Sequence, residues 1–485
     1  MEILVSEDIT ALKSLLIVLL TRISELESSL VILEGENSKL QTFNTVLQVE
    51  NEEFRQRLNK NSSNSHKPPS SDGLSKKPAI PKTKGKISGG QVGHKGITLK
   101  MVEKPDVIIV HYAESCRCCQ KTFSEQDVYE TVQKRQVFDI PTPRLEVTEH
   151  QIGLIKCCGE LHSGTFPEGV TNWVQYGNKI KGLSSLLNTD YRLPYNKIEQ
   201  LFSDIYDCQF NESTAITSNR ALDVALIPTE NTIKAAILES EVIHCDETGM
   251  RVEGKLHWFH TVSTLLFTYL FAHAKRGKEA LMSASSLIKD FHNTVVHDCW
   301  ASYFDFLDCF HVLCNAHIVR ELVNLTENGS VWASKMHSLL FELYQKSEKG
   351  TIVVSDKELW IQKYKDICQL ADEEEPPPIK KPKGEKGKPK NSKGRNLLNR
   401  LVKYQQGILA FAFIENVPFT NNLAERDIRC LKVKQKVSNS FRTFDGATNY
   451  ARIQGFTSSL RKHKMNVFQN IVDVLDKKTV LFSTK

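Results

Sequence analysis

The sequence predicts an α/β core preceded by a long coiled-coil helix, a small cysteine-bearing β module and a helical segment. Three observations support this prediction. They are a seven-residue spacing of apolar side chains over residues 1–58, two cysteine clusters within residues 101–170, and a series of β-rich segments from residue 241 onward. A chain of 485 residues is long enough for about three folding units.

The composition is that of an ordinary globular chain, with 40% hydrophobic and 25% charged residues. The net charge of +6 is unevenly distributed, so local basic stretches point to polyanionic partners. The longest apolar run near the start, residues 15–20, is shorter than a membrane span and lacks a signal-peptide cleavage site. Twelve cysteines in a chain of this length fit a reducing compartment. We therefore expect a cytoplasmic protein without a membrane partner.

Residues 1–58 have the clearest periodicity. The apolar or Asn positions step alternately by three and four residues through Leu16, Leu19, Ile23, Leu26, Leu30, Leu33, Asn37, Leu40, Asn44, Leu47, Asn51, Phe54 and Leu58. Such heptads impose a left-handed supercoil, and Asn at the a positions favours a parallel two-stranded pairing. The prediction is a leucine-zipper-like coiled coil that forms a homodimer or a higher oligomer. The alternative is an amphipathic helix packed on its own domain, for which this stripe is narrow.

Two lysine-rich segments interrupt the globular pattern. Residues 59–100 hold nine Lys against one Asp and cannot build a core, so we expect either a disordered linker or a flexible basic arm that binds phosphates. Residues 373–395 hold five Pro and seven Lys and predict a disordered surface loop. This loop lies within residues 331–415.

Residues 101–170 predict a zinc-finger-like module. Tetrahedral zinc takes four S or N ligands from two tight turns, and the candidate ligands are Cys116, Cys119, Cys157 and Cys158. Cys118 competes with Cys119, and His162 competes with Cys157 for the fourth position. The intervening residues 132–156 are rich in Val and Ile and predict β-hairpin strands. The alternative is that the cysteines are buried without metal.

Residues 171–240 predict short helices, with segments 193–207 and 211–226 on either side of a Cys-Gln-Phe turn. Asn211 can cap the second of them. If the pair is a helix-turn-helix, the side chains that face DNA phosphates or base edges are Ser213, Thr214, Thr217 and Arg220. A plain helical hairpin between two domains fits the pattern equally well.

Residues 241–330 carry the β signal of the core. "EVIHCDETGM" predicts a strand that ends at Asp246, "KLHWFHTVST" its hairpin partner, "LLFTYLFAHA" a third strand and "GKEALMSASSLIKDF" a helix. "NTVVHDCWASYF" predicts a fourth strand ending at Asp298, and "FHVLCNAHIVRELVNL" a fifth strand leading into a helix with His317. This is the ribonuclease H-like order, in which the first and fourth strands are neighbours. Asp246 and Asp298 are therefore expected to approach each other.

Residues 416–485 supply a third acid. "TNNLAERDIRCLKVKQK" predicts a helix with Glu425 in its first turn and three bases, Arg429, Lys432 and Lys436, on the same face. These bases are expected to meet DNA phosphates.

Three carboxylates can hold a pair of divalent ions that act on a phosphodiester. Such ions activate a water or a 3′-hydroxyl and stabilise the departing oxygen. We expect Asp246, Asp298 and Glu425 to be catalytic ligands of two Mg²⁺ or Mn²⁺ ions, with His317 as a residue that orients a ligand.

Each acid also has a purely structural explanation. Asp246 can end a strand in a turn, Asp298 can cap a helix that starts at Ala301, and Glu425 can close a capping box with Asn422. Taken together these explanations weaken, because the three acids fall at the positions where this fold needs metal ligands.

The order of these blocks resembles that of transposases of the insertion sequence 66 family, in the DDE superfamily. The motifs that carry the resemblance are "NSSNSHKPPSSDG", "GGQVGHKG", "GTFPEGV", "DETGMRVEGKLHWFH", "HDCWASYF", "CNAHIVREL", "NNLAERDIR" and "NYARIQGFTSSLRKH". The resemblance covers nearly all of the chain. The sequence departs from the family pattern in two places. Ile155 stands where the second cysteine cluster of the family has its leading Cys, and the lysine-rich segment 379–395 is longer than is usual in the family.

The resemblance implies a bacterial insertion-sequence enzyme that acts by DNA cleavage and strand transfer. It also implies a triad of Asp246, Asp298 and Glu425, magnesium, a structural zinc, an N-terminal zipper and a helical insertion before the last acid. The expected partners are double-stranded DNA, a second copy of the chain and, where they are required, accessory proteins, with association with the nucleoid through DNA. The alternatives are a catalytically silent zipper and zinc DNA-binding protein of the repressor kind and a structure-specific nuclease of the same superfamily.

Overall fold

The computed structural model describes residues 2–58, 60, 64–65, 99–111, 113–124, 126, 129–378 and 391–482. Most of the basic segment 59–100 and residues 379–390 of the expected loop 373–395 lie outside the described residues. The chain forms two compact units. Unit 1 comprises Met1–Leu74, Ile233–Gly249 and His257–Arg429, and unit 2 comprises Ser75–Thr232, Met250–Leu256 and Cys430–Lys485.

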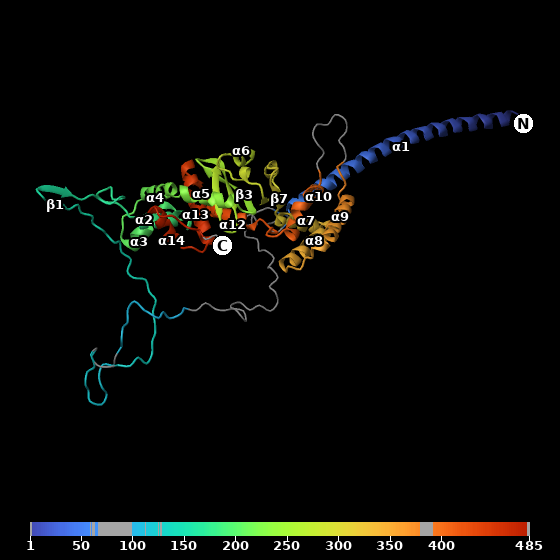
Figure 1. Cartoon of the computed structure of the whole chain (residues 1–485). Coiled ribbons are helices and arrows are strands. Elements are labelled where there is room, and N and C mark those ends of the chain that lie inside the picture. The colour runs from blue at the N-terminus through green and yellow to red at the C-terminus, as the bar shows by residue number, and fades with distance from the viewer. Residues whose placement is uncertain are drawn as a thin grey trace. The chain divides into compact units, whose positions relative to one another are not determined.

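The predicted N-terminal helix is present as α1 (Glu2–Leu58), a single continuous helix (Figure 1). Apolar side chains of its heptad seam are exposed in the single chain: 50% of Ile23, 58% of Leu30 and 66% of Leu40 are accessible to solvent. Pairing of α1 with a second copy stays a prediction. Across the described residues, every helix is too short or too polar to cross a membrane.

A mixed sheet forms the centre of unit 1, in the strand order β5-β4-β3-β6-β7. Its strands are β3 (Val242–Val252), β4 (Lys255–Ser263), β5 (Thr268–His273), β6 (Thr294–His297) and β7 (Phe310–Leu313). β4 and β5 are antiparallel, whereas β3, β6 and β7 run parallel. A short strand, β8 (Ser440–Phe441), pairs with the last residues of β3. This sheet with its many helices fits the predicted ribonuclease H-like α/β class.

The first predicted strand is longer than expected, so Asp246 lies within β3 and not at its end. Thr248, Met250 and Val252 continue the burial alternation of the strand, with at most 5% of each side chain exposed. The strand ends at Glu253 and Gly254, which have φ values of 53° and 74°. A two-residue turn with both φ angles positive matches the twist of a β-hairpin, so β3 turns directly into β4.

The prediction of one helix over "GKEALMSASSLIKDF" is wrong, because most of this segment is not helical. α6 covers Lys278–Leu281, and a 3₁₀ turn follows at Ile288–Asp290. The serines between them form turns, with backbone bonds from Ser286 N to Ser283 O and from Ser283 N to Ala280 O. Serine competes for backbone hydrogen bonds in this way and is therefore a weak helix former.

Helices occupy the chain between β7 and Glu425. They are α7 (Asn315–Glu327), α8 (Val331–Glu348), α9 (Lys357–Glu374), α10 (Lys393–Lys403) and α11 (Gln405–Phe413). Their apolar faces share one core with the sheet, where Trp332, Tyr364 and Leu397 are fully buried together with Val296 of β6. Since α9 extends to Glu374 and α10 starts at Lys393, the predicted loop 373–395 is helical at both of its ends.

Unit 2 contains a helical cluster: α2 (Asn178–Thr189), α3 (Tyr195–Tyr206), α4 (Glu212–Ala225), α13 (Phe444–Lys462) and α14 (Val467–Leu475). The two helices predicted on either side of the Cys-Gln-Phe turn are confirmed as α3 and α4. The predicted cap is confirmed as well, because the Asn211 side chain accepts a hydrogen bond from Ser213 N at 2.8 Å. Gly182 lets α2 approach α14 closely, since a Cβ there would lie 3.1 Å from a methyl carbon of Ile471.

The strands predicted within residues 132–156 are largely absent. The hairpin consists of β1 (Leu154–Cys157) and β2 (Glu160–Ser163), and residues 129–153 carry no strand. Their apolar side chains are exposed, 95% for Val132 and 90% for Val137. A β-prone sequence needs a packed face to form a sheet, and this segment has none among the described residues.

Lys434 is a buried base in unit 2, on α12 (Asn422–Ser438). Its side chain is 6% exposed and lies 5.7 Å from the ring centroid of Tyr450. Burial, aided by the charge of Arg192, lowers the pKa of Lys434 to about 8. The folded state therefore prefers the neutral amine, and stability rises as the pH climbs from about 8 toward the unfolded pKa of ~10.4.

Lys434→Met is expected to raise the free energy of unfolding at pH 7 by about 2 kcal/mol, because the cost of a buried charge disappears. It should also flatten the rise in stability above pH 8. Urea unfolding at pH 7 and at pH 9.5 measures both effects. The matched control is Lys432→Met at an exposed position of the same helix. Equal gains in the two variants would contradict the role of burial.

Candidate active site

The register of the sheet brings two of the predicted acids to the same level. Val242 pairs with Thr294 and His244 with Val296, a constant offset of 52 residues between parallel neighbours. Continued by two residues, this offset places Asp246 opposite Asp298, which follows directly after β6. Adjacent strands lie about 4.8 Å apart. The predicted approach of the first and fourth strands is therefore confirmed.

The first turn of α12 brings Glu425 to this sheet because two neighbouring side chains anchor it. Asn421 is buried, and its side chain bonds His244 Nδ1 at 3.0 Å and donates to the backbone oxygen of Cys245 at 2.7 Å. Asp427 accepts hydrogen bonds from Ser263 Oγ at 2.8 Å and Thr268 Oγ1 at 2.9 Å. Glu425 thus lies between an anchor to β3 and an anchor to β4 and β5.

The charges of the other two predicted acids, Asp298 and Glu425, affect the pKa of Asp246. Burial raises the pKa of Asp246 well above its usual range, and the charges of Glu247, Asp298 and Glu425 raise it further. Its carboxylate accepts a hydrogen bond from Glu247 N at 2.9 Å. Ionised carboxylates gathered in a buried place need a cation, and oxygen donors of this kind suit Mg²⁺ or Mn²⁺. The donor set therefore fits the predicted metals.

A fourth acid, Glu247, has a separate set of partners that the sequence analysis missed. Its side chain is 1% exposed, and both Nε and Nη2 of Arg276 donate to its Oε1, at 3.0 and 2.7 Å. Tyr303 donates to Oε2 at 2.7 Å. The Arg276 guanidinium lies over the rings of Trp258 and Trp300, at 4.8 and 4.4 Å from their centroids. In the sequence Glu247 follows Asp246 in "DET", but Arg276 lies 29 positions later in the basic segment "KRGK", so no local pattern links the two residues.

His297 precedes Asp298 and is fully buried. Burial lowers the pKa of His297 to about 3, so the ring is neutral at physiological pH. Its Nε2 lies 3.0 Å from His311 Nδ1, and its ring packs at 4.6 Å between centroids against Tyr303. These contacts fix the end of β6, from which Asp298 follows.

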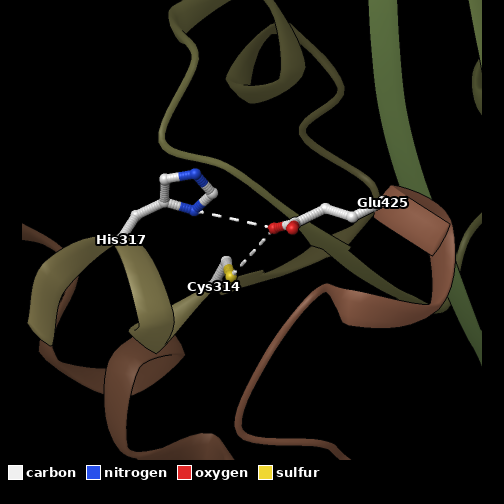
Figure 2. A group of neighbouring side chains, drawn as sticks. All are labelled: Cys314, His317 and Glu425. Atoms are coloured by element: carbon white, nitrogen blue, oxygen red, sulfur yellow. Dashed lines mark hydrogen bonds and ion pairs between the residues drawn. The ribbon is translucent and has the colours of Figure 1, made fainter. Parts of the chain in front are cut away.

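Glu425 also lies beside a cysteine and the histidine that the sequence singled out (Figure 2). Cys314 Sγ is 3.9 Å from Glu425 Oε1, and His317 Nδ1 is 4.0 Å from the same oxygen. Among the described residues, this trio is the group of potential metal ligands whose atoms all lie within 4.8 Å of one another. Asp246 and Asp298 do not belong to that group. Cys314 was missed as a candidate, although its CxxH spacing to His317 is visible in the sequence.

The three bases predicted to meet DNA are exposed on α12. Arg429 is 70% exposed, with its Nη2 4.0 Å from Glu425 Oε2, and Lys432 and Lys436 follow on the helix as exposed side chains. In unit 2, Ser213, Thr217 and Arg220 are exposed on α4, and Thr214 is half-buried.

The candidate zinc ligands lie in two turns, as predicted. Cys116 Sγ accepts a hydrogen bond from Cys118 N at 3.4 Å, and bonds to the backbone of Cys119 and Cys118 lower the pKa of Cys116. Cys157 ends β1, and Cys158 follows in a turn with a φ of 54°. Their sulfur atoms are 3.6 Å apart. In the part of the chain that the structure describes, the two turns are not joined into one ligand group.

Comparisons with known families place the sheet and all three acids within one matched region. Residues 176–449 match the family described as Transposase IS66 family. Residues 6–100 match a family of unknown function (DUF6444). No curated protein matches the chain.

Proposed function

Because the chain belongs to the IS66 family of transposases, we propose that it binds the ends of an insertion sequence and catalyses metal-dependent DNA cleavage and strand transfer. The observation that supports this most directly is the parallel register of β3 and β6, which sets Asp246 opposite Asp298. The charge of Glu425 also raises the pKa of Asp246, which supports Glu425 as the third acid of the proposal.

In this proposal Asp246, Asp298 and Glu425 hold two Mg²⁺ ions. When bound, these ions supply Lewis acidity and activation of the attacking water or 3′-hydroxyl. The carboxylates fix the positions of the ions, and the anchors Asn421 and Asp427 hold Glu425 in place during the reaction. No covalent bond to the protein forms: water first cleaves the phosphodiester at the transposon end, and the freed 3′-hydroxyl then attacks a target phosphodiester, whose own 3′-oxygen leaves.

The exposed bases supply the contacts to the DNA backbone. Arg429, Lys432 and Lys436 follow Glu425 on one helix at spacings that repeat on one face. A phosphate bound along this face lies beside the reacting group. In unit 2, Ser213, Thr217 and Arg220 on α4 belong to a helix-turn-helix that forms a proposed DNA-binding surface of its own.

The remaining segments serve binding and assembly in this proposal. The segments are a coiled coil at 1–58, a basic linker at 59–100, a zinc module at 101–170, a helical DNA-binding segment at 171–240 and a core of 241–330 and 416–485 split by the helical insertion 331–415.

The zinc module is tested by the metal content of the full chain, which Cys116→Ser should reduce. Equal zinc content in both proteins would remove the module from the proposal.

Strand transfer is the decisive test of function. Labelled transposon ends incubated with the full chain and Mg²⁺ are expected to become joined to a target plasmid. Glu425→Gln should bind the ends with unchanged affinity but join them at least ~10³-fold more slowly, because a lost metal ligand removes about 4 kcal/mol of transition-state stabilisation. The matched control is Glu415→Gln, an exposed acid outside the site. Cleavage without joining would indicate a nuclease, and binding without cleavage a repressor.

Self-association through α1 is tested by charge placement on the helix. Leu30→Lys introduces a charge into the seam and is expected to convert the oligomer to a smaller species, because a charged side chain cannot be buried between two helices. Val31→Lys introduces the same charge off the seam, at a side chain that is 67% exposed, and should leave the mass unchanged. Sedimentation velocity measures both. A monomeric wild-type chain would contradict the zipper.

A further inference from the structure

Cys314 and His317 reach Glu425 because of how α7 begins. Cys314 follows β7 and occupies the position before the first residue of α7, and His317 lies in the first turn of that helix. The CxxH spacing therefore presents the thiol and the imidazole together at one helix end. The first turn of α12 brings Glu425 to the same point (Figure 2).

The trio is joined by long contacts: the Cys314 thiol donates a weak hydrogen bond to Glu425, and the His317 ring lies near the same oxygen. The 4.0 Å from His317 Nδ1 to Glu425 Oε1 exceeds the ~3.2 Å limit of an N–H···O bond. The 3.9 Å from Cys314 Sγ to the same oxygen is also long. Ligands bound at 2.0–2.3 Å around one tetrahedral ion lie roughly 3.3–3.7 Å apart, which is close to the separations found here. One ion can therefore contact all three groups after small side-chain movements.

The surroundings of the thiol favour a metal-bound sulfur. Cys314 is 1% exposed, and its Sγ accepts a hydrogen bond from Asn421 N at 3.1 Å. An N–H group directed at sulfur helps to stabilise a thiolate, whereas burial raises the pKa of the Cys314 thiol to about 11, so the thiolate forms when a cation binds it. A ligand set of sulfur, nitrogen and one oxygen is softer than the carboxylates around Asp246 and selects Zn²⁺ or Co²⁺ over Mg²⁺.

We propose that Cys314, His317 and Glu425 form a binding site for a soft divalent ion of the Zn²⁺ class. Three protein ligands leave the fourth tetrahedral position open to water or to a substrate oxygen. Since Glu425 is also a proposed magnesium ligand, an ion in the soft site competes with Mg²⁺ for this carboxylate. This competition, unlike the soft site itself, rests on the proposed function.

Cobalt absorption tests the site without any DNA reaction. Co²⁺ is titrated into the full chain carrying Cys116→Ser and Cys119→Ser, so that the zinc module contributes little. A near-ultraviolet charge-transfer band is expected from the Cys314 thiolate bound to Co²⁺. Cys314→Ser should abolish the band, and His317→Gln should weaken cobalt affinity by 10–100-fold.

The matched control is Cys309→Ser, because Cys309 is another buried thiol, which donates to the Phe291 carbonyl oxygen at 3.0 Å. Serine can keep that hydrogen bond, and the cobalt band should persist. Circular dichroism checks that each variant is folded. If Cys314→Ser does not fold, His317→Gln still tests the site, because it leaves the thiol in place. Absence of the band in the parent protein would overturn the site. So would a band as strong, and a cobalt affinity as high, in Cys314→Ser and His317→Gln as in the parent protein.

Competition is measured by repeating the cobalt titration in excess Mg²⁺. The apparent cobalt Kd is expected to rise several-fold, and Asp246→Asn should reduce that rise because it weakens the magnesium pair. A cobalt Kd that is indifferent to Mg²⁺ would overturn the sharing of Glu425. Because the spectrum needs no catalysis, an intact cobalt band in a protein that fails to join DNA ends would count against the proposed function and not against this site.

Discussion

Asp246→Asn is expected to abolish strand transfer and at the same time to make the metal-free protein more stable. Asn keeps the oxygen that accepts the hydrogen bond from Glu247 N, so the local backbone is preserved. It removes a half-buried acid whose ionised form is disfavoured by burial and by the charges of Glu247, Asp298 and Glu425. Removing an unfavourable interaction that is kept for function typically raises the free energy of unfolding by about 1–2 kcal/mol. Joining should fall by at least ~10³-fold, because a neutral amide is a poor ligand for Mg²⁺.

The pH dependence gives this prediction a second signature. The folded-state pKa of Asp246 is raised, so its contribution to stability is fully present below the unfolded pKa of ~3.9 and is lost as the pH rises through the folded pKa. Bound Mg²⁺ reverses this loss, because it favours the ionised form. The increase in melting temperature on adding Mg²⁺ should therefore be larger at pH 8 than at pH 6.

Thermal unfolding with and without Mg²⁺ measures these effects in parallel with the joining assay. The matched control is Asp290→Asn, an exposed acid of unit 1 outside the acid cluster. It should change neither stability nor joining. An Asp246→Asn protein that is less stable than wild type without metal, or that joins DNA normally, would contradict the assignment.

Arg276→Ala is expected to lower the free energy of unfolding by about 3 kcal/mol, because it leaves the buried Glu247 carboxylate without its cation. Arg276 itself is 40% exposed, so water replaces part of the lost interaction and keeps the loss near the lower end for a buried pair. The packing of the guanidinium over Trp258 and Trp300 is lost as well. Burial already raises the pKa of Glu247, and without Arg276 it should rise further.

A double-mutant cycle separates the ion pair from this packing. Glu247→Gln removes the charge that Arg276 neutralises, so the double variant should lose less stability than the sum of the single losses. The control is Lys278→Ala, which breaks an exposed 3.4 Å pair with Asp305 and should cost ~0.5 kcal/mol or less. Urea unfolding measures the wild type, the three variants of the cycle and the control. Additive losses in Arg276→Ala and Glu247→Gln would show that the two residues act independently.

The sequence could predict those features that short-range patterns encode. The α1 helix follows from its heptads, the Asn211 cap from local chemistry, and the proximity of β3 and β6 from strand order. The length of β3 was underestimated because an acid interrupts its apolar run, although burial alternates up to Val252. The strands expected in residues 129–153 failed because local β propensity cannot supply a packing partner.

Long-range polar contacts lay beyond what the sequence could reveal. The contacts of Asn421 with His244 and Cys245 join residues about 176 positions apart, and no local pattern marks them. The pair of Arg276 and Glu247 was hidden for the same reason, because a basic turn usually faces solvent. His317 was singled out in the sequence, but its proximity to Glu425 depends on the packing of α7 against α12, which no local pattern predicts.

The two anchors of α12 separate the geometry of the catalytic acids from the size of the helical insertion. Asn421 and Asp427 attach the start of α12 directly to the strands, so Glu425 has ties to the sheet in addition to the packing of the preceding helices. The surface of the stretch between α7 and α12 can therefore change during evolution while the buried side chains of its helices and the two anchors keep the acid in register with its partners. Family members are expected to differ most in this stretch, where a new surface can be acquired without rebuilding the chemistry.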